Sequence, residues 1–355
     1  MLTVILVNTV AILFAYLAGK KGNLFYLKSS FFVLFLFLAL RYNYGNDYVS
    51  YLDRFTEINL LELTVLGGDH AEPGWILLCR LFEPLGFFAM VAVLAAFNCF
   101  VYYTFVSKYV PRDYYWFALF IYTFDAQIML VHSSAMRQSL AISIFLLAID
   151  HLHQKNTVRY LALVAIAMSF HMSAFILLPV FLLGLFNWKV NTQFAVCVLA
   201  TFVSFFVFNK AIEQNLSLFV NAFMGKYGFY DERAELGTGL GLLFYAGILA
   251  TMLYYARFWK DKYSLLAKLS MLSYLIMPLG LVILMIGRLG MYFQPITLAV
   301  YPYIFMSVKN SAFKYLIMAA IGLMTLYQFI GFFRSPVWYD AFGTYQTIFT
   351  APAIY

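Results

Sequence analysis

The sequence is poor in charge, because Asp, Glu, Lys and Arg together make up only 11% of its 355 residues. Hydrophobic residues make up 64% of the chain and aromatic residues 20%. So few charges could not cover the apolar surface of a water-soluble fold of this length. The composition therefore excludes an ordinary soluble protein and predicts an integral membrane protein.

Cysteine and the common cofactor motifs are scarce as well. The three cysteines lie far apart in apolar runs, so they form no disulfide or metal pattern: Cys79, Cys99 and Cys197. The sequence contains no Walker A loop, no Rossmann glycine fingerprint, no HExxH zinc motif and no Gly-x-Ser-x-Gly elbow. We therefore expect no nucleotide site, no metal site and no cofactor.

The formal net charge is +7, with 23 Lys and Arg residues. These residues fall mainly in short gaps between apolar runs, where Lys and Arg mark the cytoplasmic side of a membrane protein. We therefore interpret the charge as a topology signal, and we expect no nucleic-acid partner.

Long apolar runs predict membrane-spanning helices, because a span needs about 20 apolar residues and lipid leaves no backbone polar group unpaired. Residues 74–85 are apolar but short and predict an interfacial or re-entrant helix. The first run has no basic segment or cleavage site, so it reads as a retained helix. The expected spans are 2–18, 29–41, 86–106, 114–131, 135–152, 158–187, 193–209, 239–258, 264–287, 289–307 and 312–333. The fold class is thus an all-α polytopic membrane protein, with about ten to twelve transmembrane helices in a single domain over residues 1–355.

The run 158–187 is too long for one simple span. If two short helices turn back near His171, every basic cluster, including the densest one at 257–268, falls on the cytoplasmic side. We therefore predict a broken hairpin at His171. Residues 42–73 and 210–237 then form outer loops, and residues 287–290 form an outer turn.

Charged groups at membrane depth are costly, by at least about 2.5–3.5 kcal/mol at a helix centre. The predicted topology places Arg41, Arg137, Arg288 and His171 at outer helix ends, and His132 at the same face but in no recognised motif. Several guanidinium groups in one outward cavity would bind a phosphate or pyrophosphate. Each of these residues alone could also have a purely structural role. Arginine at a helix end often extends its charged group to the lipid phosphates, and a single histidine in an apolar run often serves packing.

Five short motifs follow one another in a fixed order. They are Arg41-x3-Gly45-x-Asp47-x3-Ser50, Glu72-Pro73-Gly74-Trp75, Met136-Arg137-Gln138-x2-Ala141, Phe170-His171-x-Ser173-Ala174 and Arg288-x3-Tyr292. With the tail motifs Trp338-Tyr339 and Tyr345-Gln346-Thr347-Ile348-Phe349, this order resembles the EpsG family of Wzy-like polysaccharide polymerases. The resemblance extends from about residue 38 to the end of the chain.

The resemblance implies a multi-pass protein of the bacterial cytoplasmic membrane, similar to GT-C glycosyltransferases, with an active site facing outward. Its substrates would be glycans linked to undecaprenyl pyrophosphate within membrane lipid. It would polymerise their repeat units into O-antigen, capsule or exopolysaccharide by metal-independent, inverting transfer. A Wzz-type chain-length regulator is a further partner that the resemblance implies.

The residues fit that chemistry, because a sugar–pyrophosphate bond breaks when the developing negative charge is stabilised. We expect Arg41, Arg137 and Arg288 to hold the pyrophosphate, and Gln138 and Tyr292 to bind sugar or phosphate oxygens. The base that deprotonates the acceptor hydroxyl stays open between three residues, His171, Asp47 and Glu72.

The sequence leaves other functions open. An O-antigen ligase would use the same chemistry with another acceptor, and a lipid-linked glycan transporter or flippase would use a cationic cavity without catalysis. A membrane O-acyltransferase would need a histidine deep in the membrane. The gathering of ionisable groups toward one face, rather than at mid-membrane, favours an enzyme over a transporter.

Overall fold

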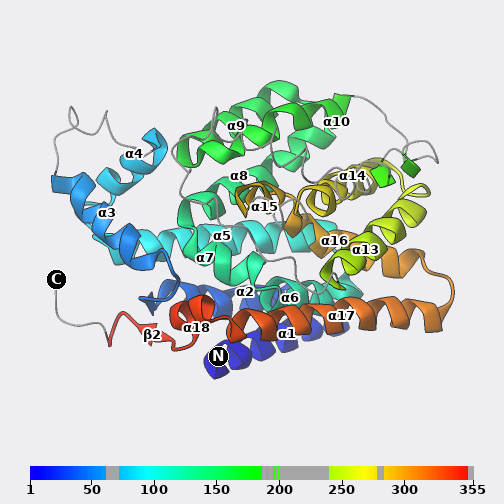
Figure 1. Ribbon diagram of the computed structural model, residues 1–355, viewed down its shortest axis with the longest axis horizontal. Helices are drawn as coiled ribbons and strands as arrows, with labels where there is room; N and C mark the ends of the chain where they lie inside the picture. Colours follow the sequence, from blue (N-terminus) through cyan, green and yellow to red (C-terminus); the bar gives the residue numbers. More distant parts are fainter. Residues whose placement is uncertain are drawn as a thin grey trace. The chain divides into compact units, whose positions relative to one another are not determined.

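The computed structural model describes residues 1–60, 72–185, 190, 195–196, 198–199, 240–277 and 284–350. These residues are almost entirely helical (Figure 1), which confirms the predicted all-α polytopic membrane fold. They pack into two compact units, one made of Met1–Pro179 with Asn310–Tyr355 and the other of Val180–Lys309. The predicted outer loop 210–237 and most of the predicted span 193–209 lie outside the described residues.

The first unit holds most of the described helices. Its elements are α1 (Leu2–Lys21), α2 (Leu24–Ala39), β1 (Arg41–Tyr42), α3 (Tyr48–Leu60), α4 (Pro73–Leu81), α5 (Phe87–Tyr109), η1 (Arg112–Tyr114), α6 (Tyr115–Phe124), η2 (Gln127–Val131), α7 (His132–Ser134), α8 (Met136–His153), α9 (Thr157–Phe170), η3 (Met172–Val180), α17 (Ser311–Arg334), α18 (Pro336–Phe342) and β2 (Gln346–Thr347).

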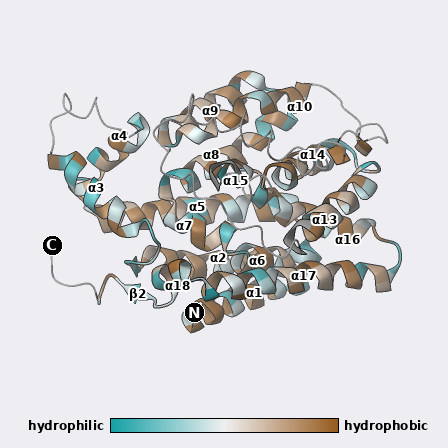
Figure 2. Ribbon diagram, in the orientation of Figure 1, coloured by the Kyte–Doolittle hydropathy of each residue, from teal (hydrophilic) through white to brown (hydrophobic). Residues whose placement is uncertain are grey.

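Neighbouring helices of this unit pack in series. Helix α1 packs against α2 and α6, α2 against α5, α5 against α8, and α8 against α9, while α17 returns to contact α6 (Figure 1). Figure 2 shows that apolar residues dominate α1, α5 and α17, whereas α3 carries more hydrophilic residues. This pattern agrees with lipid-facing helices and one amphipathic helix.

The second unit contains the remaining described elements. These are α10 (Phe181–Leu185), α13 (Leu240–Ala256), α14 (Asp261–Ile276), α15 (Leu284–Gly290), η6 (Gln294–Ile296) and α16 (Thr297–Ser307). Helix α14 packs against α13, α15 and α16.

Three described helices are long and apolar enough to cross a membrane alone, namely α1, α5 and α17. A fourth candidate is the pair Arg112–Phe124 and Gln127–Ser134, which is bent by 64° and covers the predicted span 114–131. Shorter apolar helices are Leu24–Ala39, Thr157–Phe170, Met172–Leu185 and Leu243–Ala256. The full number of crossings and the assignment of the outer face stay predictions.

The predicted break at His171 is confirmed. Helix α9 ends at Phe170, and the 3₁₀ helix η3 begins at Met172. The Tyr160 hydroxyl donates a hydrogen bond to the Leu177 carbonyl across 2.8 Å. In one continuous helix these two residues would lie about 25 Å apart, so the chain folds back between them.

One local prediction is wrong, and another segment contains a helix that the sequence did not reveal. The predicted outer loop 42–73 contains helix α3, whose apolar residues Tyr48, Leu52, Phe55 and Ile58 share one buried face; the position of this segment on the outer side stays a prediction. This spacing is the helical period, and it outweighs the charges between them. The predicted turn at residues 287–290 is the end of helix α15, and the chain turns only at residues 291–293.

Candidate functional site

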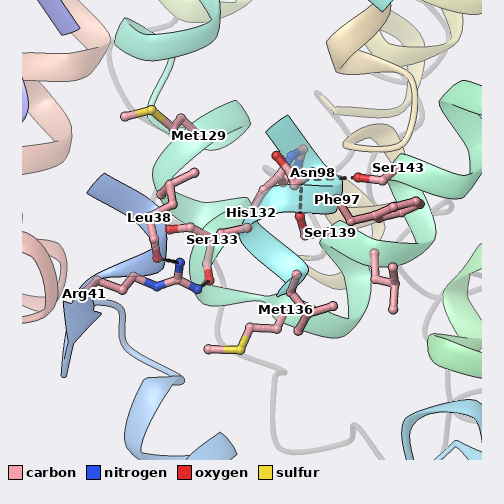
Figure 3. Close-up of a pocket in the computed structure, with 13 residues that line it drawn as sticks. Leu38, Arg41, Phe97, Asn98, Met129, His132, Ser133, Met136, Ser139 and Ser143 are labelled. Atoms are coloured by element: carbon pink, nitrogen blue, oxygen red, sulfur yellow. Dashed lines mark hydrogen bonds between the residues drawn. The ribbon is translucent and has the colours of Figure 1, made fainter. Parts of the chain in front are cut away.

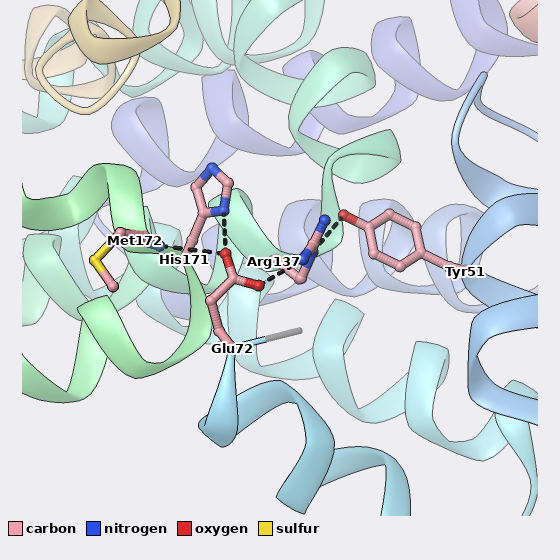
Figure 4. Close-up of polar contacts among 5 residues, drawn as sticks. All are labelled: Tyr51, Glu72, Arg137, His171 and Met172. Atoms are coloured by element: carbon pink, nitrogen blue, oxygen red, sulfur yellow. Dashed lines mark hydrogen bonds and ion pairs between the residues drawn. The ribbon is translucent and has the colours of Figure 1, made fainter. Parts of the chain in front are cut away.

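The Glu72 carboxylate is the centre of a polar cluster in the first unit (Figure 4). Its oxygen Oε2 lies 2.5 Å from Nη1 of Arg137, and its Oε1 lies 3.3 Å from Nδ1 of His171. The Met172 main-chain N–H donates to the same Oε1 across 3.3 Å. The side chain of Glu72 is only 9% exposed, so one buried carboxylate joins three partners from two other segments.

Local structure explains why the Glu72 side chain is free to make these contacts. Glu72 is the residue before helix α4, and its carbonyl accepts the first helical N–H groups, from Trp75 and Ile76. Pro73 occupies the first helical position, where its missing N–H costs nothing. The carboxylate makes no capping bond to its own helix and reaches across to α8 and α9.

His171 occupies the junction between α9 and η3. Its N–H donates to the Ala167 carbonyl, and its own carbonyl accepts from the Ala174 N–H, each across 3.0 Å. An ionised Glu72 only accepts hydrogen bonds, so Nδ1 of His171 carries the hydrogen of their contact. In the neutral ring, Nε2 is then the unprotonated nitrogen, and it points away from Glu72 (Figure 4).

Arg137 lies in the first turn of α8. Its Nε donates to the Tyr51 hydroxyl across 3.4 Å, and its guanidinium carbon lies 5.7 Å from the centre of the Tyr51 ring. The Arg137 side chain is 27% exposed. Glu72 and Tyr51 thus orient the guanidinium while part of its surface stays accessible to a ligand.

Gly74 allows α4 and α9 to approach closely enough to bring Glu72 to His171. A methyl group at Gly74 would lie 2.5 Å from Oγ of Ser169 and 2.9 Å from its carbonyl oxygen. The second atom belongs to the backbone and could not move aside without shifting the helix. This contact explains why glycine follows proline in the Glu72-Pro73-Gly74-Trp75 motif.

The electrostatics of the cluster favour an ionised Glu72. Burial acts to raise the pKa of the Glu72 carboxyl, but the hydrogen bond from His171 and the charge of Arg137 outweigh it and lower this pKa to about 2. A carboxylate with so low a pKa is a poor proton acceptor at neutral pH. The geometry shows that Glu72 contacts both His171 and Arg137 and can orient them, and its role as a base stays a prediction.

Asp47 lies at the edge of the cluster. Its main-chain N–H donates to the Ser134 hydroxyl across 3.1 Å, close to the start of α8. Burial raises the pKa of the Tyr51 phenol, Arg137 opposes that rise, and the charge of Asp47 adds to it. Asp47 thus lies within electrostatic range of Tyr51, and its role as a base stays a prediction.

Arg41 lies outside this cluster. Its side chain is 3% exposed, and its two Nη atoms donate to the carbonyls of Leu38, across 2.5 Å, and Ser133, across 2.9 Å. The first carbonyl belongs to the last turn of α2, where a positive charge is favourable. The structure thus gives Arg41 a buried, helix-capping position, and its contact with pyrophosphate stays a prediction.

The other predicted ligands are placed as follows. Gln138 is buried in α8 beside Arg137, and consecutive helical residues point in different directions. Arg288 is exposed in α15, and Tyr292 is fully buried after it, both in the second unit. The roles of these three residues in substrate binding stay predictions.

Sequence analysis missed Tyr51. Its ring packs against that of Trp75, which is 1% exposed, with the ring centres 5.2 Å apart. The signal for Tyr51 was its place one helical turn after Asp47, which becomes visible only when residues 48–60 are recognised as a helix.

Within the described part of the chain, no group of three or more His, Cys, Asp or Glu side chains could hold a metal ion. Chemically, the arrangement offers an oriented imidazole that can accept a proton, next to a guanidinium whose surface is partly accessible.

Fold and cluster together define a multi-pass helical membrane protein with a buried carboxylate that joins an arginine to a histidine. A family model matches residues 24–347, nearly the whole chain, and its description is the EpsG family. The chain therefore belongs to the EpsG family, a family of Wzy-like polysaccharide polymerases. No curated protein and no solved structure matches the chain.

Proposed function

We propose that this protein polymerises glycan repeat units carried on undecaprenyl pyrophosphate, at the outer face of the bacterial cytoplasmic membrane. Membership of the EpsG family supports a polysaccharide polymerase role. The observation that supports the finer proposal is the Glu72–Arg137–His171 cluster. It combines a guanidinium that can bind phosphate with an imidazole that can take the proton of a hydroxyl. The product would be O-antigen, capsule or exopolysaccharide.

In the proposed reaction, Nε2 of His171 takes the proton from a hydroxyl at the non-reducing end of a new repeat unit. The hydroxyl oxygen attacks the anomeric carbon of the lipid-linked growing chain from the face opposite the pyrophosphate. The bond from this carbon to the pyrophosphate oxygen breaks, and its electron pair leaves with the lipid carrier. The configuration at the anomeric carbon is inverted in this single displacement.

Arg137 stabilises the negative charge that develops on the leaving pyrophosphate. Its planar fork of donors fits phosphate oxygens, and its contacts with Glu72 and Tyr51 hold it in place before substrate arrives. Glu72 keeps Nδ1 of His171 protonated, so that the opposite nitrogen is the one that accepts the proton. One carboxylate thus prepares both halves of the reaction.

The test is the length distribution of the glycan in cells whose chromosomal copy is replaced by Arg137→Ala or Arg137→Lys. Both variants should lose long chains and leave a single-repeat product, because lysine supplies charge without the bidentate fork. Arg54→Ala is the matched control, because Arg54 lies on the neighbouring helix α3 and pairs with Glu57 on the surface. It should give a normal ladder.

The alternatives give different products. A ligase defect would leave full-length polymer on the lipid carrier, and a flippase defect would leave single repeat units on the cytoplasmic side. Either product in the Arg137→Ala strain, or a normal ladder in it, would overturn the proposal.

A further inference from the structure

Two polar features of the described chain take no part in the proposed reaction, a small pocket in the first unit and a basic surface in the second. The pocket has a volume of about 30 Å³, and Asn98 donates there to the hydroxyls of Ser139 and Ser143 (Figure 3). A water molecule needs about 10–15 Å³, so the pocket has room for one or two of them. The basic surface is open and can therefore meet a larger partner.

The basic surface lies where the loop between α13 and α14 meets the end of α16. Helices α13, α14 and α16 pack against one another (Figure 1). The indole Nε1 of Trp259 donates to Oγ of Ser307 across 2.8 Å, joining residues 48 positions apart in the chain. The Tyr303 ring stacks on that of Tyr263 with centres 3.4 Å apart, and it meets the Trp259 ring edge-on at 5.3 Å. These contacts fix the loop to α16.

Four basic side chains gather around the bond between Trp259 and Ser307. They are Arg257, Lys260, Lys262 and Lys309. Each lies within three residues of Trp259 or Ser307, so its Cα is within about 11 Å of one of the two. The same stretches, residues 254–263 and 303–309, contain a single acid, Asp261. The surface formed by these four side chains is therefore strongly positive.

Three of the four charges have no carboxylate partner within the described part of the chain. Arg257, Lys260 and Lys309 are exposed, and among the described residues none of them forms an ion pair. The guanidinium carbon of Arg257 lies 4.3 Å from the centre of the Tyr254 ring and 4.7 Å from that of the Phe258 ring. Contact with ring faces orients a guanidinium and leaves its N–H groups available to an acceptor.

Exposed apolar side chains border the basic surface. Tyr254 is 53% exposed, Phe258 65% and Met306 56%. In a protein that crosses a membrane, exposed apolar residues next to Lys and Arg mark the boundary between acyl chains and headgroups. Aromatic residues such as Trp259 and Tyr303 are typical of the same depth. The basic side chains therefore lie at the level of the lipid phosphates.

We propose that the basic surface binds the headgroups of anionic phospholipids. The phosphates supply the negative charge that the described residues nearby do not, and the acyl chains lie against Tyr254, Phe258 and Met306. Each phosphate can meet a different side chain, so the four basic groups need not surround one point. A soluble phosphate would leave the apolar border uncovered, which makes a lipid the better partner.

This binding differs from the topology signal that Lys and Arg give. A topology signal acts during insertion and requires no preference among lipids in the folded protein. A binding surface does require one. Headgroups that contact both Lys260 and Lys309 would also hold the α13–α14 loop to the end of α16, in addition to the Trp259–Ser307 hydrogen bond.

The test titrates the purified full-length protein in detergent with dioleoyl phosphatidylglycerol or dioleoyl phosphatidylcholine and measures bound lipid by native mass spectrometry. The two lipids share their acyl chains and differ in net charge. We expect phosphatidylglycerol to bind about tenfold more tightly, because each nearby Lys or Arg adds to the attraction of an anionic headgroup. Sodium phosphate should not displace it beyond the effect of sodium chloride at equal ionic strength. Equal binding of the two lipids, or displacement by phosphate, would overturn the proposal.

The variant Arg257→Gln/Lys260→Gln/Lys309→Gln should lose most of the preference for phosphatidylglycerol. If this variant does not fold, Lys260→Gln/Lys309→Gln takes its place, because it keeps the contacts of Arg257 with its two rings. It should lose a smaller part of the preference, about half on a logarithmic scale.

The matched control is Lys28→Gln/Lys155→Gln/Arg159→Gln, which removes three exposed charges from the first unit. It should keep the tight binding of phosphatidylglycerol. Equal losses in this control and in the variant of the basic surface would show that the attraction comes from net charge alone, and the proposal would then be wrong.

Discussion

Nδ1 of His171 and the carboxylate of Glu72 lie 3.3 Å apart although 99 positions separate the two residues in the sequence. The contact joins the residue that follows α9 to the residue that precedes α4. It decides which nitrogen of the imidazole is available to accept a proton.

The variant His171→Asn separates the two functions of the imidazole. The asparagine amide nitrogen takes nearly the place of Nδ1 and can still donate to Glu72, but the variant has nothing in the place of Nε2. We expect polymerisation to fall about 10²–10⁴-fold, the usual contribution of a general base, while Tm changes little. The measurements are the glycan ladder in cells and the Tm of the purified variant.

A normal ladder from His171→Asn would show that the base lies elsewhere, and Asp47→Asn would then be the next variant to examine. A variant that loses both the ladder and its thermal stability would point to a packing role for His171.

The stability of the protein should depend on the charge of Glu72 in acid. The pKa of Glu72 in the folded protein is about 2, below its ordinary value of 4.5. A lowered pKa stabilises the fold fully above pH 4.5, and the stabilisation is lost as the pH falls toward 2. Its size is on the order of 3 kcal/mol.

The measurement is Tm against pH for the unmodified protein and for Glu72→Gln, which keeps the shape of the side chain. The difference in Tm should be constant between pH 5 and 8 and should shrink below pH 4.5. A difference that instead shrinks between pH 5 and 8 would mean that Glu72 titrates there and is not held ionised by its partners.

The variant Gly74→Ala should separate α4 from α9. Its new methyl group would meet the Ser169 carbonyl oxygen at 2.9 Å, so the helix must move and the contact between Glu72 and His171 must lengthen. We expect at least a tenfold loss of polymerisation, because misplaced catalytic groups cost activity steeply. The assay is the glycan ladder at matched protein abundance.

The control for this substitution is Gly331→Ala in α17, where an added methyl group has open space around it. This variant should polymerise normally. Equal activity of Gly74→Ala and Gly331→Ala would show that the close approach of α4 and α9 does not position the cluster.

The C-terminal segment should support the site through the Arg41 segment. Strand β2 pairs with β1, and the Tyr345 ring stacks on Phe37 with centres 4.6 Å apart. The Tyr345 hydroxyl also donates to the Phe37 carbonyl across 2.6 Å. We expect Tyr345→Ala to lower Tm by several degrees and Tyr345→Phe to lower it less, because only the hydrogen bond is lost.

Both variants are compared by thermal unfolding in nanodiscs, with Tyr339→Ala as the control, because Tyr339 is an exposed residue of α18. If Tyr345→Ala unfolds at the same temperature as the unmodified protein, the tail does not stabilise the Arg41 segment.

Much of the fold followed from the sequence because apolar runs of sufficient length have few alternatives in lipid. The run 158–187 shows this best, since its length and the neighbouring basic clusters together predicted the break at His171. Glu72, Arg137 and His171 were identified as candidates, but nothing in the sequence indicated that one carboxylate contacts the other two.

The features that the sequence did not reveal depend on side-chain direction and on short helices. The charges of residues 47–60 concealed the apolar face of α3, and with it the position of Tyr51. For Arg41, motif position suggested a pyrophosphate ligand, which stays a prediction, but gave no sign that its guanidinium donates to two carbonyls of neighbouring helices. Such side-chain contacts depend on packing between segments that are far apart in the chain, and this packing cannot be deduced from a single sequence.

The pairing of β1 with β2 has a consequence for biosynthesis. Residues 41–42 enter the membrane early in translation, but their partners at residues 346–347 leave the ribosome only after some 300 further residues have been synthesised. The Arg41 segment therefore cannot acquire its final contacts until residues 346–347 have been synthesised. A nascent chain that holds only the helices before them would still lack the strand pairing that fixes this segment.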